Sequence, residues 1–216
     1  MSRHAPLTRS LILIALGLVG LACSNRKSEV TPTASARASS DPVADAAPER
    51  GTIECMSIEA PPGSSKAAGI GGGLSFRAGK QLRSGTVSYD PSFTVTTQAA
   101  EGAKVDAIRD ELLATFTKDY AAVLRTTSRT GGLPPSELQP PRVTASPVAG
   151  LPGHAWQIDS VVSFNGERLP WRAYSMTTVF RDRVYVVTAA AAMTNIGELK
   201  ASADRYFASI RFDVCK

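Results

Sequence analysis

Apolar residues recur at every third or fourth position between residues 104 and 124, and charged residues fill much of the remaining space. The apolar positions are Val105, Ile108, Leu112, Phe116, Tyr120 and Val123. Because a helix has about 3.6 residues per turn, this spacing places the apolar side chains on one face and the charged ones on the other. The pattern predicts an amphipathic helix over residues 102–126 that packs against a core.

A different period follows the proline-rich segment 133–141. Apolar and polar residues alternate, with many β-branched and aromatic side chains, over residues 142–148, 155–164, 171–180 and 184–192. A period of two predicts strands that bury one face. Asn165-Gly166 is a residue pair preferred in two-residue hairpin turns, and residues 181–183 offer a second turn. We therefore expect an antiparallel meander of four strands.

The pattern is weaker on both sides of these elements. Residues 52–58, 74–76 and 93–97 are expected to form strands before the helix. Asn195 and Glu198 have the spacing of a helix capping box, which predicts a second helix near the C-terminus. The apolar face of that helix comprises Ile196, Leu199, Ala203 and Phe207. Residues 210–214 alternate again and predict a closing strand.

Two segments resemble a known family, namely residues 177–188 (TTVFRDRVYVVT) and residues 208–212 (ASIRF). Together with the order of elements, they resemble the PsbP-like superfamily over residues 52–216. The resemblance implies a single α+β domain in which helices flank an antiparallel sheet as an α/β/α sandwich. It also implies a binding or accessory role, because members share a fold rather than an active site.

The N-terminus has the organisation of a secretory signal peptide. Arg3 and Arg9 precede an apolar run over residues 11–22, and no acid occurs in this segment. The run is shorter than the roughly 20 residues that a membrane-spanning helix needs. Residues 1–22 are therefore expected to direct export and then to be removed.

The segment Val19–Cys23 (VGLAC) resembles a bacterial lipobox. The resemblance implies that Cys23 receives acyl chains such as palmitate and becomes the first residue of the mature protein. Ala22 fits the small residue before the cut, whereas Gly20 replaces the usual leucine. Ser24, rather than an acid, follows the cysteine, which implies sorting to the outer membrane on its periplasmic side. An ordinary signal peptide with an incidental cysteine is the alternative.

Composition separates a tether from a domain. Residues 23–51 are rich in Ser, Ala, Pro and Thr and contain no aromatic residue. Such a segment cannot bury enough apolar surface to fold, so it is expected to be a flexible tether. Residues 52–216 are sufficient for one domain with a sizeable core. That domain carries 18 basic and 15 acidic residues without a basic run, which disfavours nucleic-acid binding.

Two cysteines remain once Cys23 is acylated. Cys55 lies near the start of the domain and Cys215 is the penultimate residue. An exported domain meets oxidising conditions, in which thiols within reach of each other form a bond. We expect a structural Cys55–Cys215 disulfide, with two buried free thiols as the alternative.

The domain is poor in candidate catalytic groups. His154 is its single histidine, follows Pro-Gly, and is expected at an exposed turn or strand edge. One histidine and two oxidised cysteines cannot form a zinc site, and no cofactor motif is present, so no metal or cofactor is expected. The glycine-rich segment 69–73 lacks the helix and Gly-Lys-Ser/Thr signature of a phosphate-binding loop and is expected to be a plain loop.

Acids and aromatics leave two further candidates. A glycosidase needs a pair of carboxylates, which could come from Glu54, Glu59, Asp159, Glu167 and Asp182, although solvated surface acids are the simpler interpretation. Trp171 follows Pro170 after the expected hairpin turn and is the candidate for an exposed binding anchor. The other aromatics of the meander are expected to form the core.

These features favour a lipid-anchored, non-catalytic binding or accessory module of the bacterial envelope, with a protein partner. A carrier of a small apolar ligand or lipid is the first alternative, and a cavity between sheet and helix would favour it. A carboxylate-dependent envelope hydrolase is the second.

Overall fold

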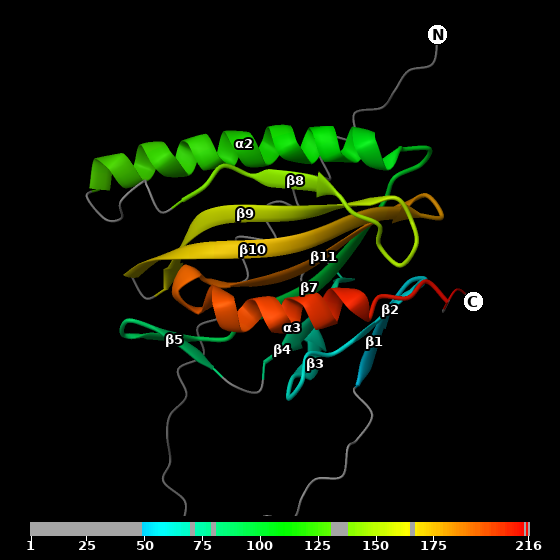
Figure 1. Cartoon of the computed structure of the whole chain (residues 1–216), viewed down its shortest axis with the longest axis horizontal. Coiled ribbons are helices and arrows are strands. Elements are labelled where there is room, and N and C mark those ends of the chain that lie inside the picture. The colour runs from blue at the N-terminus through cyan, green and yellow to red at the C-terminus, as the bar shows by residue number, and fades with distance from the viewer. Residues whose placement is uncertain are drawn as a thin grey trace, which may run out of the picture.

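The computed structural model describes residues 49–69, 72–78, 81–130, 138–164, 167–213 and 215, and a seven-stranded sheet forms its centre (Figure 1). The strand order is β3 (Ser65–Ala68), β4 (Leu74–Arg77), β7 (Ser92–Ala99), β11 (Arg183–Ala192), β10 (Glu167–Phe180), β9 (Gly153–Phe164) and β8 (Arg142–Ala145). All neighbouring strands are antiparallel. With helices packed on the sheet, this architecture confirms the predicted α+β fold class.

Strands β9, β10 and β11 form the long meander that the alternating pattern predicts. Arg181 and Asp182 join β10 to β11 with φ values of 48° and 55°, and two left-handed residues in succession suit the twist of a hairpin. Pro170 lies inside β10, although the predicted strand began one residue later. It pairs with Val161 of β9, whereas the pairing of β10 with β11 begins only at Trp171, so Pro170 has a single neighbouring strand, as a residue of an edge strand does. The predicted Asn165-Gly166 turn lies outside the described residues.

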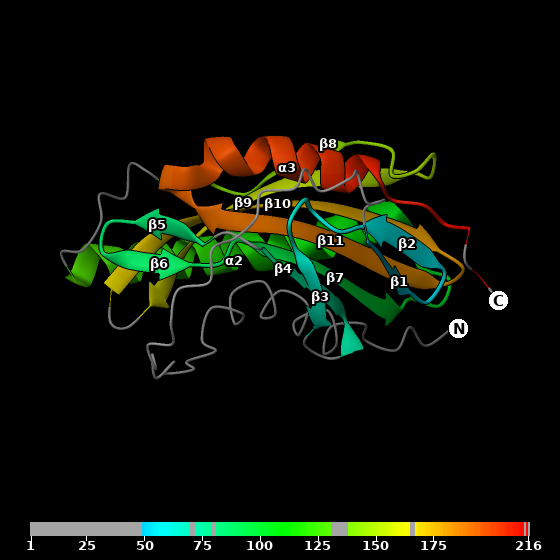
Figure 2. The ribbon, with the colours of Figure 1, turned by 90° about the horizontal axis from the view of Figure 1, so that it is seen from below.

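The two helices lie on opposite faces of the sheet (Figures 1 and 2). Helix α2 (Val105–Thr130) packs on the face that carries Val186, and helix α3 (Ile196–Ala208) packs on the face that carries Val187. These valines are consecutive in β11, and neighbouring residues of a strand point to opposite faces. The predicted α/β/α layering therefore follows from the register.

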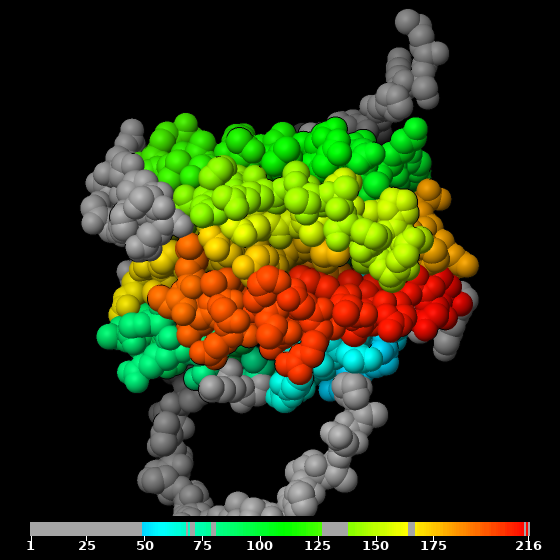
Figure 3. Space-filling view, viewed as in Figure 1, coloured from blue at the N-terminus to red at the C-terminus, as the bar shows by residue number. Residues whose placement is uncertain are grey.

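Helix α2 buries the apolar face that its sequence predicts, whereas α3 buries Leu199 and Ala203 of its predicted face together with Tyr206, which the prediction left out. Helix α2 buries Ile108, Leu112 and Phe116, and the Phe116 ring meets Trp156 of β9 edge-on with centroids 5.7 Å apart. Helix α3 buries Tyr206 among aromatic rings of β4 and β7. Such edge-to-face pairs each add about 0.5–1.5 kcal/mol to the burial of area. Figure 3 shows α3 and the segment after it as one continuous band of atoms across this face.

The N-terminal strand prediction is wrong in one respect. Residues 52–58 do not form one strand but belong to a hairpin of β1 (Arg50–Ile53) and β2 (Met56–Glu59). Glu54 has a φ of 51° and turns the chain with Cys55. Strand β1 also begins two residues before the expected start of the domain, so Arg50 and Gly51 belong to the sheet rather than to the tether. Weak alternation in this segment concealed the turn.

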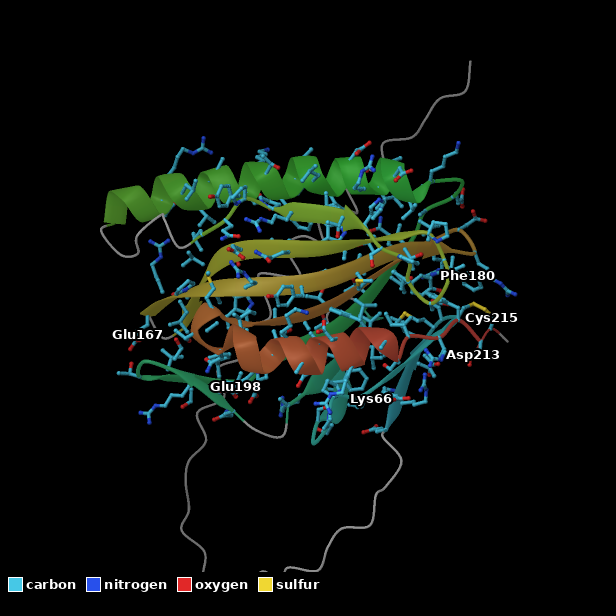
Figure 4. All side chains as sticks on the ribbon, viewed as in Figure 1. Lys66, Glu167, Phe180, Glu198, Asp213 and Cys215 are labelled. Atoms are coloured by element: carbon cyan, nitrogen blue, oxygen red, sulfur yellow. A yellow bond between two sulfur atoms is a disulfide. The ribbon has the colours of Figure 1, made fainter. Side chains whose placement is uncertain are left out.

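The predicted closing strand over residues 210–214 is also wrong for its described part. Arg211 forms a single bridge with Ser57 of β2, with both backbone N–H···O distances at 2.9 Å. The chain then runs past Asp213 to Cys215, beside the β1–β2 turn (Figure 4). The short alternating run therefore has a strand-like pattern but only one bridging residue.

The predicted capping box at the start of α3 does not form. Tyr89, at the end of the hairpin of β5 (Leu82–Ser84) and β6 (Val87–Tyr89), donates its hydroxyl hydrogen to Asn195 Oδ1 at 2.7 Å. Its oxygen also accepts the N–H of Ala192 at 3.1 Å. The Asn195 side chain is thus used in a tertiary contact, and α3 has no side-chain cap hydrogen bond. Burial raises the pKa of Tyr89 to about 12.

Three sequence predictions concern residues outside the described part of the chain. These are the signal peptide over residues 1–22, acylation of Cys23, and the tether up to residue 48. Among the helices that the structure describes, none is long and apolar enough to cross a bilayer.

Candidate functional site

The structure joins Cys55 to Cys215 in a disulfide, as predicted. The two Cα atoms lie 4.3 Å apart, although 160 positions separate the cysteines in sequence. Arg50 strengthens the same junction, because its guanidinium donates to the carbonyl oxygen of Ser209 at 3.0 Å and pairs with Glu59. The disulfide therefore connects the first hairpin of the domain to its last segment, which is a structural role.

Asp159 is the most buried of the five candidate acids. Its side chain is 1% exposed and forms a bidentate pair with Arg172, with both N–O distances at 2.7 Å. It also accepts the backbone N–H of Gln139 at 2.9 Å. The hydrogen bond to Asp159 is the main cause of the raised pKa of Arg172. A carboxylate held this way stabilises strands β9 and β10 and is not free to act as an acid or nucleophile.

The other four candidate acids also have separate structural partners. Their contacts are Glu54 with Arg183, Glu59 with Arg50, Glu167 with the Thr86 hydroxyl, and Asp182 with the N–H of Gly102. Glu54 and Glu59 belong to the β1–β2 hairpin but pair with different arginines, and Figure 4 shows Glu167 at the opposite end of β10 from Phe180, which precedes the turn that holds Asp182. Each acid therefore serves a local contact of its own.

His154 occupies an unexpected position. It lies in β9 rather than at an exposed edge, and only 3% of its surface is exposed. Its Nε2 atom is 3.2 Å from Asp106 Oδ1 at the start of α2, whereas its buried Nδ1 has no hydrogen-bond partner. Thr177, its partner across the β9–β10 ladder, has a buried hydroxyl that is likewise unpaired. The prediction of an exposed histidine failed because α2 covers this end of the sheet.

The prediction that Trp171 is an exposed anchor is wrong. Trp171 is 5% exposed, and its ring packs against Tyr89 with centroids 5.1 Å apart. The β5–β6 hairpin covers the tryptophan, and no local sequence pattern indicates that long-range packing. Trp171 thus belongs to the core, as the other aromatics of the meander were expected to.

An open pocket lies between β1 and the hairpin of β3 and β4. It has a volume of about 400 Å³ and is lined by Thr52, Ile53, Lys66, Ala67, Gly72, Gly73 and Leu74. Three of the lining side chains are apolar, and Lys66 is the one ionisable residue among them. The volume falls within the range of about 300–1,000 Å³ that is typical of ligand pockets. The sequence did not reveal this pocket, since its walls come from separate hairpins.

The glycine-rich loop contributes backbone to the pocket, not a phosphate cradle. Gly69 donates its N–H to the carbonyl oxygen of Gly73 at 3.1 Å, which closes the loop between β3 and β4. Gly72 has a φ of 79°, a conformation that favours glycine. A strand follows this loop, as predicted, so the helix N-terminus that a nucleotide phosphate needs is not built here. In the described parts of the chain, no cluster of His, Cys, Asp and Glu could hold a metal ion.

Comparison with known proteins gives structural matches only. Neither a family model nor a curated protein sequence matches this chain. The structure is similar to that of CyanoP, a cyanobacterial PsbP from Synechocystis, with 12% identity and a TM-score of 0.47 over 81% of this chain and 98% of that one. It is also similar to LpqN, involved in cell envelope biogenesis of Mycobacterium tuberculosis, with 9% identity and a TM-score of 0.43 over 77% of this chain and 85% of that one.

A third match is a protein from Bacteroides thetaiotaomicron, with 8% identity and a TM-score of 0.41 over 76% of this chain and 48% of that one. A PsbP protein is thus among the structures that this chain resembles. At these identities and scores the likeness concerns the arrangement of strands and helices. The function has to be argued from the residues of this chain.

Proposed function

We propose that this protein is a lipoprotein of the bacterial envelope, anchored through Cys23, whose domain is a non-catalytic binding or accessory module. The main observation behind the proposal is that each candidate acid has its own structural partner. Glycoside cleavage needs two carboxyl groups roughly 5–10 Å apart across one bond, with one of them available for proton transfer. Asp159, the most deeply buried candidate, is instead neutralised by Arg172.

The position of the domain relative to the proposed anchor also supports this role. Strand β1 begins at Arg50, which leaves 26 residues after Cys23. The tether that the composition predicts would, as a flexible chain of that length, have a root-mean-square span of about 5–6 Å times the square root of its length, or roughly 28 Å. The domain would therefore remain close to the membrane surface, with β1 at the point of attachment. By its resemblance to lipoproteins with Ser after the cysteine, the chain is proposed to reside in the outer membrane, facing the periplasm.

Metabolic labelling with an alkyne analogue of palmitate tests the anchor. The intact chain should incorporate label, whereas a Cys23→Ser variant should not. Cys55→Ser is the matched control, because it removes a cysteine that is not the proposed site and should retain the label. Equal labelling of the intact chain and the Cys23→Ser variant would refute the anchor.

Cross-linking in cells tests the accessory role. An accessory module should give one stoichiometric cross-linked product with the anchored protein that is lost or reduced with Cys23→Ser. The same product at the same yield from both forms would show that anchoring does not serve the interaction. No product from either form would favour the alternative of a small-ligand carrier.

A further inference from the structure

We propose that the pocket between β1 and the β3–β4 hairpin binds a single-chain anionic amphiphile, with its acid group at Lys66 and its chain on Ile53 and Leu74. This inference deepens the proposed binding role and rests on it. Its geometric basis is the pocket of about 400 Å³ that these residues line. A ligand that carries two acyl chains would exceed a pocket at the small end of the usual range.

Lys66 provides the charge that selects an anion. It is the single charged residue of the lining and it is exposed, and although its backbone pairs with Phe76 in the β3–β4 ladder, its side chain forms no ion pair with any described residue. The acids of the adjacent hairpin are already paired, Glu59 with Arg50 and Glu54 with Arg183. The ammonium group is thus available to an incoming carboxylate or phosphate. Figure 4 shows Lys66 at the outer margin of the domain, beside β3.

The remaining lining suits an alkyl chain. Leu74 is 3% exposed and belongs to the core at the base of the pocket, so the apolar surface open to a ligand comes mainly from the half-buried Ile53 and Ala67. Gly72 and Gly73 carry no side chain, so a ligand can approach their backbone closely. Each methylene that leaves water for such a surface strengthens binding by up to about fourfold. The combination of an apolar floor and one cation at the rim fits a fatty-acid-like ligand.

The position of the pocket gives it access to membrane lipid. Thr52 and Ile53 belong to β1, the strand that directly follows the proposed tether. One wall of the pocket is therefore the part of the described domain nearest to the anchor in sequence. An amphiphile that leaves the bilayer would meet this hairpin within the reach of the tether.

Titration of the purified Cys23→Ser chain with decanoate, followed by amide NMR shifts, tests the proposal. Decanoate should shift the lining residues, and octanoate should bind severalfold more weakly because it has two fewer methylenes. Two control ligands should bind much more weakly than decanoate. Decyltrimethylammonium has the same alkyl chain with the opposite charge, and acetate has the same charge without the alkyl chain.

Substitutions at Lys66 isolate the charge. Lys66→Met keeps the apolar stem and should weaken decanoate binding about three- to fivefold, the effect of one solvent-exposed ion pair. Lys66→Arg should restore most of that affinity. Lys118→Met is the control, because Lys118 is an exposed lysine on α2, a helix that does not line the pocket. It should bind like the parent chain.

Several results would overturn the inference. The inference fails if decanoate shifts amides over the whole surface, or if decyltrimethylammonium binds as tightly as decanoate. It also fails if Lys66→Met binds decanoate with unchanged affinity, or if an extended acidic peptide binds more tightly than decanoate. The result of the decanoate titration does not depend on the proposed anchor, because the titration uses an unacylated chain. Loss of palmitate labelling with intact decanoate binding would therefore reject the proposed anchor but keep the pocket.

Discussion

The disulfide offers the sharpest test of how this domain is stabilised. Cys55 and Cys215 join the turn of the first hairpin to the end of the chain, across a separation of 160 residues. Replacing both cysteines by serine should leave the folded contacts in place and free the ends of the unfolded chain. The expected result is a less stable domain with the same fold.

The size of the loop sets the magnitude. In the chain-entropy model, closing a loop of 160 residues lowers the entropy of the unfolded state enough to stabilise the fold by about 5 kcal/mol at 25 °C. This value is an upper bound, because engineered and natural disulfides often deliver less. For a domain of this size, 1 kcal/mol shifts the melting temperature by about 2–4 °C, so the full effect corresponds to about 10–20 °C.

Thermal and urea unfolding, monitored by circular dichroism in a Cys23→Ser background, measures the effect. Cys55→Ser, Cys215→Ser and the double variant should all lose the same stability, because either single change breaks the same bond. The parent chain should lose as much when a reductant is added. Reductant should have no effect on the double variant.

A melting temperature lowered by less than about 3 °C would refute the entropic reasoning. It would mean that the unfolded chain retains enough residual structure to keep its ends close together without the bond. In the folded chain, the two hydrogen bonds between Ser57 and Arg211 and the bond from Arg50 to Ser209 connect the same segments whether or not the disulfide is present.

Three further predictions follow from single contacts. Arg172→Met should lower the free energy of urea-induced unfolding by about 3–5 kcal/mol, because Asp159 would be left buried without its partner; a loss below 1 kcal/mol would contradict a buried ion pair. Gly153→Ala should lower the free energy of unfolding by about 1–3 kcal/mol, because the added Cβ would lie 2.8 Å from a carbonyl oxygen of β10. Gly197→Ala in α3 is the control, because its Cβ meets no atom within 4 Å, and it should raise the free energy of unfolding by up to about 1 kcal/mol. Equal effects of the two changes in urea unfolding would disprove the steric argument. Burial raises the pKa of Tyr89 to about 12, so the stabilisation contributed by its neutral hydroxyl should be complete below pH 10 and should be lost as the pH rises through 12. Tyr89→Phe should be less stable than the parent chain at neutral pH but should lose less stability as the pH rises. Parallel profiles of stability against pH for the two proteins would refute this.

The periodicity of apolar residues was sufficient to predict the helices and strands in which that periodicity is strong. Helix α2 and strands β9, β10 and β11 are long, and their apolar positions follow one period over many residues. The disulfide could also be expected, because the predicted export and the predicted acylation of Cys23 leave two cysteines under oxidising conditions. Shorter segments were less predictable. The weak alternation over residues 52–58 concealed a turn at Glu54, and the alternation after residue 209 gave one bridge instead of a strand.

The fate of individual side chains depended on contacts between distant segments. Trp171 is core because the β5–β6 hairpin brings Tyr89 against it, and His154 is buried because α2 crosses the end of β9. The cap at Asn195 failed for the same reason, since Tyr89 uses that side chain. No local window contains both members of these pairs, so their sequence pattern cannot report them.

The sequence by itself determined the fold class, the meander, the buried face of α2 and the disulfide, because periodicity and residue chemistry act locally. The tertiary structure decided which polar groups are available for chemistry. It paired Asp159 with Arg172 and left Lys66 free beside an apolar floor formed by Leu74. Whether a polar side chain is available for chemistry depends on which segments pack against it, and that packing involves contacts between distant parts of the chain. That is why the candidate acids could be named from sequence, whereas the pocket emerged only when the hairpins were placed side by side.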